Sequence, residues 1–483
     1  MRSRRDTQPM RPVKRKKYDT QPTRSVNSEN RVRTGYQTRR STIDSSYQVY
    51  QHSNIGRVYQ MERTENRTRY MNYDSYDSLK GSQRHREDVD NKKNAPKSVF
   101  SKIFVGKDAQ FFDYELLLVI LFLMCFGLVM LYSVSAYSAQ NDFGNDMYYF
   151  SKQALVGVVS FAWMLFVSKI DYHVYGAFSF EIYIFAMVMM ALVQTPLGVE
   201  AYGARRWIQL PGNMTLQPSE ITKIAVILFI SYEICRLGKK ITTREGTIRV
   251  FAFGVIAAAG VMFLTDNLST AIIVMAITCI LYFVIHPKLK PFIQIVAVGA
   301  AAVAVGVMAL AAIVGNSTSE NFRIRRILTW LDPENNADTG GFQVMQGLYA
   351  IGSGGFFGKG LGNSTQKLGI IPEVQNDMIL TVICEELGVF GVIVILVLFA
   401  FMLYRLMFVA QNSPDLYGSL IVTGVFGHIA LQVILNICVV TNMIPTTGVT
   451  LPFFSYGGTS ILFLMTEMGI ALGVSRKIKI KED

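Results

Sequence analysis

The sequence predicts an all-α polytopic membrane protein of about ten transmembrane helices, with a large extracytoplasmic loop between spans 7 and 8. The first of three observations behind this prediction is that 51% of the 483 residues are hydrophobic and the mean hydropathy is +0.29. A second is that apolar runs long enough to cross about 30 Å of hydrocarbon recur along the chain. The third is that basic residues collect in alternate connecting loops, as cytoplasmic loops do.

The first element is a basic arm, residues 1–110, which differs in composition from the rest. It contains 25 Lys and Arg against 12 Asp and Glu, a net charge of +13, whereas residues 111–483 carry a net charge of −1. Polar residues dominate and aliphatic residues are few, so we expect disorder. No apolar stretch follows the early cluster RPVKRKK, which excludes a signal peptide. The arm could bind nucleic acid, but a solvated cytoplasmic tail near anionic lipid headgroups is favoured.

Ten apolar runs follow, and residues 111–483 are predicted to form one membrane domain. Each run can span the hydrocarbon at 1.5 Å per residue. The runs lie at residues 114–135, 149–168, 177–196, 218–236, 249–265, 268–286, 291–314, 377–405, 416–440 and 452–474.

Basic residues orient these spans. The arm, the loop RLGKKITTREGTIR, the turn HPKLKP and the end SRKIKIKED all fall on one side. That side is predicted to be cytoplasmic, with both termini on it.

Two loops on the outer side also carry basic residues, against the usual bias. The first contains GARRWIQLPGN, with Arg205 and Arg206. The second runs from about 315 to 376 and contains NFRIRRILTW, Lys359 and Lys367. Such residues suit an anionic ligand, and pairing with loop acids or lipid phosphates is the alternative.

Glycine and proline punctuate the outer segments. The stretch IGSGGFFGKGLGNS fails the phosphate-loop pattern and is interpreted as backbone for tight turns. The last outer connection, NMIPTTGVTLPFFSYGGTS, contains Pro445, Pro452, Gly457 and Gly458 at membrane depth. Irregular backbone there is tolerated where it lines an aqueous cavity. An outward-facing polar cavity is therefore predicted.

Three acids interrupt the apolar segment EVQNDMILTVICEELG: Asp377, Glu385 and Glu386. An acid in hydrocarbon costs several kcal/mol unless it is paired or hydrated. Asp377 stands at the mouth of the helix, and Glu385 lies about 12 Å deeper by helical rise. The adjacent glutamates point about 100° apart, so they are predicted to meet different partners, in a supporting role.

One of these glutamates is predicted to pair with a buried cation such as Lys223 in QPSEITK. A local pair between Lys223 and Glu220, three residues earlier, is the alternative.

The five cysteines all lie in apolar segments without metal-ligand spacing, and the five histidines are scattered. Neither a disulfide framework nor a protein-built zinc site is expected.

Four segments resemble the SEDS family (shape, elongation, division, sporulation), which includes FtsW, RodA and SpoVE. They are RRWIQLPGNMTLQPSEITK, GFQVMQGLYAIGSGGFFGKGLGNSTQKLG, IPEVQNDMILTVICEELGVFG and TTGVTLPFFSYGGTSIL. The resemblance covers residues 112–475 and is strongest to the FtsW and SpoVE branches. One departure is LTDNLSTAIIV, where relatives read like PDLGTA.

The resemblance implies a peptidoglycan glycosyltransferase that polymerises lipid II at the outer face of the cytoplasmic membrane during cell division. Its implied partners are a class B penicillin-binding protein, other division proteins, membrane lipids and undecaprenyl-pyrophosphate-linked glycan, at the septum. No nucleic acid partner is expected.

The resemblance also marks the aspartate at the mouth of the EELG helix, here Asp377, as the essential acid. A carboxylate there can act as general base toward a sugar hydroxyl. Arg205, Arg206 and Lys367 are candidate clamps for the departing pyrophosphate, and Ser455 and Gly457 of the last loop are assigned to substrate binding. A divalent cation, Mg²⁺ or Mn²⁺, is compatible with the family, although no ligand set demands one, and no organic cofactor is expected.

Two other functions fit the same spans. A flippase or transporter of the lipid-linked precursor would also use intramembrane acids, for example in a proton relay. A division scaffold would leave Asp377 and the outer arginines without a role. An elongation or sporulation paralogue would share the chemistry.

Overall fold

The computed structural model describes residues 111–201, 204–210, 214–286, 322–336, 340–369, 371–372 and 374–479, together with a few isolated positions near residue 300. The predicted arm and most of the predicted seventh span, 291–314, lie outside these residues. Within them, seven helices are long and apolar enough to cross a membrane. They are α3 (Tyr114–Phe143), α4 (Tyr148–Val167), α8 (Arg244–Leu264), α9 (Leu268–Ile285), α13 (Ile379–Asn412), α14 (Leu416–Val440) and α15 (Gly458–Ser475).

Two further helices fall on predicted spans. The apolar α6 (Ser179–Leu192) has only 14 residues, and α7 (Pro218–Leu237) has the length to span but carries four charged side chains. Among the described residues, nine of the ten predicted spans therefore contain a helix, and the helical membrane fold is confirmed.

Capping residues fix where several helices begin. Asp113 accepts a hydrogen bond from Leu116 N at the start of α3, and Asn267 accepts one from Thr270 N at the start of α9. Asp415 does the same for Gly418 N in α14. Each cap satisfies a backbone donor that lacks an intrahelical partner.

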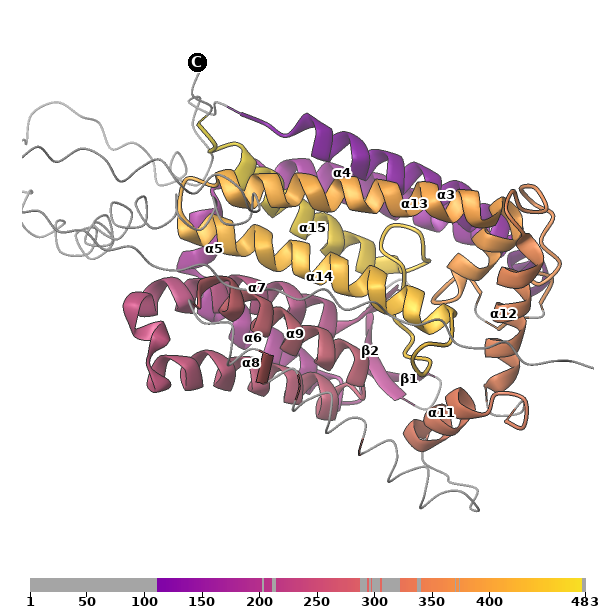
Figure 1. Cartoon of the computed structure of the whole chain (residues 1–483), viewed down its shortest axis with the longest axis horizontal. Coiled ribbons are helices and arrows are strands. Elements are labelled where there is room, and N and C mark those ends of the chain that lie inside the picture. Colours follow the sequence, from indigo (N-terminus) through magenta and orange to yellow (C-terminus); the bar gives the residue numbers. More distant parts are fainter. Residues whose placement is uncertain are drawn as a thin grey trace, which may run out of the picture. The chain divides into compact units, whose positions relative to one another are not determined.

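Helix α14 lies at the centre of the packing (Figure 1). It contacts α13 and α15 on one side and α7 and α9 on the other, while α3, α4, α13 and α15 also pack among themselves. Its side chains Leu420, Ile421, Val425 and Ile429 are fully buried. Polar groups on α14 are consequently held inside the protein, away from lipid.

The segments predicted to lie on the outer side, called the outer segments below, gather at one end of the bundle, opposite the short helix α5 (Tyr172–Ala177) (Figure 1). They include α11 (Phe322–Leu331), α12 (Gly341–Gly354) and a three-stranded antiparallel sheet of β1 (Gly198–Ala201), β2 (Ala204–Leu210) and β3 (Met214–Leu216). This sheet is an addition to the predicted all-α fold. At the opposite end the 3₁₀ turn η3 (Gly238–Thr242) links α7 to α8.

A break at Gly388 divides α13. Its φ of 69° and ψ of −170° are not helical, and a β-carbon there would lie 2.3 Å from Phe356 O. Val389 N donates to Gly355 O and Phe390 N to Phe356 O, both at 3.0 Å. The backbone of the glycine-rich stretch thus lies directly against the backbone of α13 at Gly388, and a side chain at this position would prevent the contact. Gly355, Gly358, Gly360 and Gly362 all have positive φ, which confirms the prediction of tight turns.

Candidate functional site

The backbone around Asp377 is held by α14 and the last outer loop, residues 441–457. Asn436 Nδ2, on α14, donates to Asp377 O at 2.9 Å and to Val449 O at 2.8 Å. Tyr456 N donates to Gln375 O at 2.9 Å. The buried side-chain amide of Asn436 therefore holds the last outer loop beside the backbone of Asp377.

Two arginines from separate outer segments approach the Asp377 carboxylate. A β-carbon on Gly448 would lie 3.9 Å from Arg206 Nη1 and 3.9 Å from Asp377 Oδ2, so these two atoms are no more than twice that distance apart. Arg326 is the second arginine. Burial lowers the pKa of the Arg326 guanidinium, and the negative charge of Asp377 acts in the opposite direction.

Backbone carbonyls orient both arginines. Arg206 Nη2 donates to Asp266 O at 3.1 Å, and Arg326 Nη1 donates to Thr446 O at 3.2 Å. A guanidinium carries five N–H donors in a planar fork, a geometry that matches the oxygens of an anion. Gly448, with a φ of 71° and no side chain, keeps the space beside the carboxylate open.

Arg205 lies on the other face of β2. Successive strand residues point to opposite faces, and Arg205 Nε lies 3.6 Å from Glu200 Oε2 in an exposed ion pair with its cross-strand neighbour. Of the two predicted clamps on this strand, the structure brings only Arg206 to Asp377.

Glu385 is fully buried and organises the glycine-rich turn. Its carboxylate lies 2.5 Å from Lys359 Nζ and accepts hydrogen bonds from the hydroxyl and N–H of Thr365, at 3.0 and 3.2 Å. Ser364 Oγ and Gln366 N donate to its other oxygen. A buried carboxylate is stable only when so satisfied.

Glu386 points to a different partner, as predicted for adjacent helix positions. Lys367 Nζ lies 2.7 Å from Glu386 Oε1, and Ser133 Oγ on α3 donates to the same carboxylate. Lys367 is itself buried, 8% exposed. The predicted clamp residue therefore ties the outer loop to α13 and α3.

The predicted pairing of a glutamate in EELG with Lys223 is wrong. Lys223 Nζ lies 2.9 Å from Glu220 Oε1, which was the alternative, and the glutamates pair with Lys359 and Lys367. One helical turn separates Lys223 from Glu220, so this pair forms without help from the tertiary fold.

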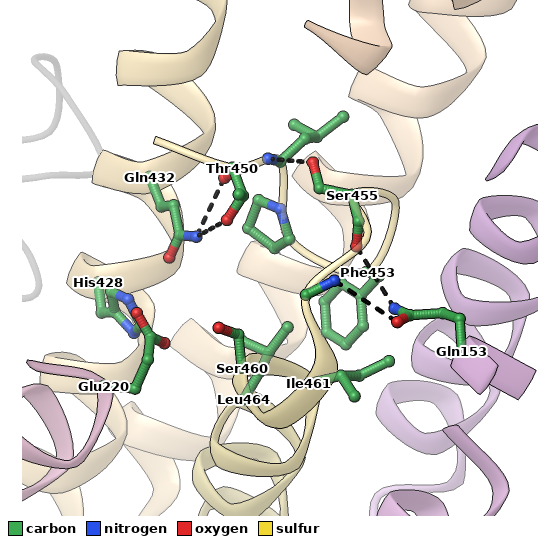
Figure 2. A pocket seen from close by; sticks show the side chains of 13 residues that line it. Gln153, Glu220, His428, Gln432, Thr450, Phe453, Ser455, Ser460, Ile461 and Leu464 are labelled. Carbon is green, nitrogen blue, oxygen red and sulfur yellow. Dashed lines mark hydrogen bonds between the residues drawn. The ribbon is translucent and has the colours of Figure 1, made fainter. Parts of the chain in front are cut away.

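Ser455 and Gly457 hold the end of the last loop. Ser455 Oγ accepts a hydrogen bond from Leu451 N at 2.9 Å, and Gly457 N donates to Gln153 Oε1 at 3.5 Å. Both residues line a small cavity below the loop, drawn in Figure 2.

The candidate site therefore contains a half-buried carboxylate and two guanidinium groups that backbone carbonyls orient near it. A carboxylate there can accept a proton, and the arginines can stabilise negative charge on a leaving group. Among the described residues no group of three or more His, Cys, Asp or Glu side chains is arranged to hold a metal ion.

Arg326 and Asn436 are the residues of this candidate site that the sequence alone did not distinguish. Arg326 was one of three arginines in RIRR, which spacing alone does not distinguish. Asn436 was hidden in an apolar run, although its place four residues after Gln432 and eight after His428 marks one polar stripe on a helix.

The comparisons with known proteins agree with this architecture. The family model for FtsW, RodA and SpoVE, described as a cell cycle protein, matches residues 114–480. Stage V sporulation protein E of Bacillus subtilis (strain 168) is 36% identical over 367 residues, which cover 75% of this chain and 97% of that protein. The probable peptidoglycan glycosyltransferase FtsW of Trichlorobacter lovleyi is 34% identical over 370 residues, covering 76% and 94%.

Solved structures share the fold. A chain from a peptidoglycan synthase complex superposes with a TM-score of 0.61 at 24% identity, covering 77% of this chain and 99% of that one. The rod shape determining protein RodA of Thermus thermophilus gives a TM-score of 0.53 at 22% identity, covering 77% and 98%.

Proposed function

This chain belongs to the FtsW, RodA and SpoVE family of cell cycle proteins, and we propose from this premise that it is a peptidoglycan glycosyltransferase. Its substrate is lipid II, which it polymerises into glycan strands during cell division. The observation that carries the proposal is the position of Asp377 beside Arg206 and Arg326 at the outer end of the bundle.

The reaction forms a glycosidic bond and breaks a bond to pyrophosphate. Asp377 accepts the proton of the attacking sugar hydroxyl, as a general base within hydrogen-bond reach of it. The hydroxyl oxygen then bonds to the anomeric carbon of the donor, and the lipid-linked pyrophosphate leaves with the bonding electrons. Arg206 and Arg326 stabilise its charge through their planar forks.

Glu385 and Glu386 support this chemistry indirectly. Each is fully buried and committed to a lysine of the outer loop. They hold the glycine-rich turn against α13, whose first residue is two positions after Asp377. Their role is to keep the aspartate at the outer end of the helix.

The protein is a multi-pass membrane protein. Its proposed site of action is the septum, with both termini in the cytoplasm. A class B penicillin-binding protein that crosslinks the new strand is the proposed partner, in keeping with the fold shared with a peptidoglycan synthase complex. A divalent cation, Mg²⁺ or Mn²⁺, carried with the pyrophosphate is compatible with the proposal, and no step depends on it.

Reconstitution tests the proposal. The purified protein and its cognate penicillin-binding protein, with the transpeptidase blocked, are incubated with lipid II, and glycan polymer is measured by gel. Polymer formation is expected, and repeating the assay with a chelator shows whether a divalent cation takes part. If the protein makes no polymer but moves a labelled precursor across the liposome membrane, the flippase alternative would replace the polymerase proposal.

A further inference from the structure

Helix α14 carries a row of polar side chains on one face: His428, Gln432 and Asn436, each four residues apart. The last two bind the backbone of the outer loop, since Gln432 Nε2 donates to Thr450 O at 3.0 Å and Asn436 Nδ2 to Val449 O. His428 lies deepest in the membrane segment and binds no backbone group among the described hydrogen bonds. Unlike Gln432 and Asn436, His428 therefore does not hold the loop backbone.

His428 forms a buried pair with an acid of α15. His428 Nδ1 lies 2.7 Å from Glu467 Oε2, and the two residues are 1% and 2% exposed. An isolated charge in this interior costs several kcal/mol, so the pair must be electrically neutral as a whole. Two arrangements achieve this: imidazolium with carboxylate, or neutral imidazole with carboxylic acid. Both require that the pair hold one proton between them.

The other ring nitrogen needs a partner. His428 Nε2 is buried and makes no hydrogen bond to any residue that the structure describes. When Nδ1 is shared with Glu467 and the ring is charged, Nε2 is an N–H donor, and leaving it unsatisfied costs about 1–3 kcal/mol.

A cavity of about 30 Å³ adjoins His428. Figure 2 shows His428, Gln432 and Glu220 on one side of it and Phe453 and Gln153 on the other. This volume accommodates one or two water molecules, which need two to four polar partners each. The lining supplies them: the Glu220 carboxylate, the Gln432 amide and the hydroxyls of Thr450 and Ser460.

We propose that this cavity is a buried water site that accepts the His428 Nε2 hydrogen and makes the proton of the His428–Glu467 pair exchangeable within the membrane core. The water bridges this pair to a second ion pair, in which Lys223 Nζ lies 2.9 Å from Glu220 Oε1 and Glu220 is partly exposed. The formal charges of the side chains around the site then sum to zero. Helix α7 contributes the cation Lys223 and the anion Glu220, and the cation His428 on α14 balances the anion Glu467 on α15. This inference is independent of the chemistry at Asp377.

X-ray hydroxyl-radical footprinting of the full-length protein in nanodiscs tests the water. Radicals formed from bound water oxidise neighbouring side chains that bulk solvent does not reach. Phe453 lines the cavity and is 4% exposed, whereas Phe454 is 0% exposed and lies off it. We expect Phe453 to be oxidised roughly fivefold faster than Phe454 in the wild type, because ordered water is held beside it.

Substitution assigns the water to His428. H428L should bring the Phe453 rate down to that of Phe454, and H428Q, which restores a donor amide, should recover it. Equal rates for the two phenylalanines in the wild type, or a Phe453 rate unchanged in H428L, would overturn the proposal.

Infrared spectroscopy tests the proton without relying on the folding of H428L. The histidine ring band that disappears in H428Q is assigned to His428 and followed after transfer of the wild type to D₂O, because ring vibrations shift when the N–H hydrogens of the ring are exchanged. A shift complete within minutes supports an exchangeable proton. A band that stays unshifted while exposed amides exchange would show a dry pair and refute the water site.

Discussion

Lys367 and Glu386 form a buried ion pair, with Nζ 2.7 Å from Oε1, although 19 residues separate them in the sequence. The pair joins the outer loop to the segment of α13 that precedes the Gly388 break. Ser133 of α3 hydrogen-bonds both partners, so three segments meet at one carboxylate.

Removing one member of this pair should cost more than removing both. Lys367→Met leaves the Glu386 charge buried and unpaired, which we expect to destabilise the protein by about 3 kcal/mol. The double variant K367M/E386Q removes both charges and should recover most of that loss. Thermal unfolding in detergent measures it, and additive losses in the double variant would contradict direct pairing.

Asp377→Asn should reduce lipid II polymerisation at least about a hundredfold, because the amide keeps the size of the side chain but cannot accept the proton. Its backbone contact with Asn436 does not involve the side chain, so expression and melting temperature should stay at wild-type values. Near-normal polymer from a well-folded variant would remove Asp377 from the catalytic role.

Arg206 and Arg205 form a matched pair of neighbours with different expected effects. R206A should lower polymerisation at least about tenfold through loss of a charge-assisted hydrogen bond to the leaving group. R205A should change it less than about twofold, since an exposed ion pair with Glu200 contributes little. R206K should restore activity only in part because a point charge lacks the fork. Equal losses in R205A and R206A would disprove the assignment based on the strand faces.

The cluster around His173, at the end predicted to be cytoplasmic, should make stability depend on pH. Burial opposes the charged imidazole, but hydrogen bonds to Asp171 and Asp415 outweigh it and raise the pKa of His173 to about 9. The stabilisation is therefore complete below the unfolded pKa of about 6.5 and is lost as pH rises through about 9.

The size of this effect is modest because the side chain is 38% exposed. After allowance for solvent screening, H173Q should remove roughly 1 kcal/mol at pH 6 and almost nothing at pH 10. Melting curves of both proteins across this range provide the measurement. A difference between them that stays constant with pH would exclude a charged His173 as its source.

Deleting residues 1–105 should leave polymerisation by the purified protein largely intact. The composition of the arm opposes a packed fold, and its predicted side of the membrane is about 30 Å from the proposed chemistry. Loss should appear in cells, as altered recruitment to the division site. A folded truncation without activity would show that the arm is coupled to catalysis.

The sequence was sufficient for the parts of this protein that local physics determines. The apolar runs predicted the helices. The three-residue spacing of Glu220 and Lys223 predicted, as an alternative, the local ion pair that the structure contains. The partners of Glu385 and Glu386 could not be foreseen, because Lys359 and Lys367 reach them only after a turn of positive-φ glycines has formed. The different positions of Arg205 and Arg206 could not be predicted, because they depend on a strand, β2, and on its register with β1.

The break at Gly388 has a mechanical consequence for α13. The glycine-rich turn is hydrogen-bonded to both sides of the break, through Glu385 O and Glu386 O before it and through Val389 N and Phe390 N after it. A displacement of this turn would therefore be passed to both parts of α13, the part before Gly388 and the part after it. The first of these parts begins two residues after Asp377, so the position of the turn and the position of this aspartate are mechanically coupled.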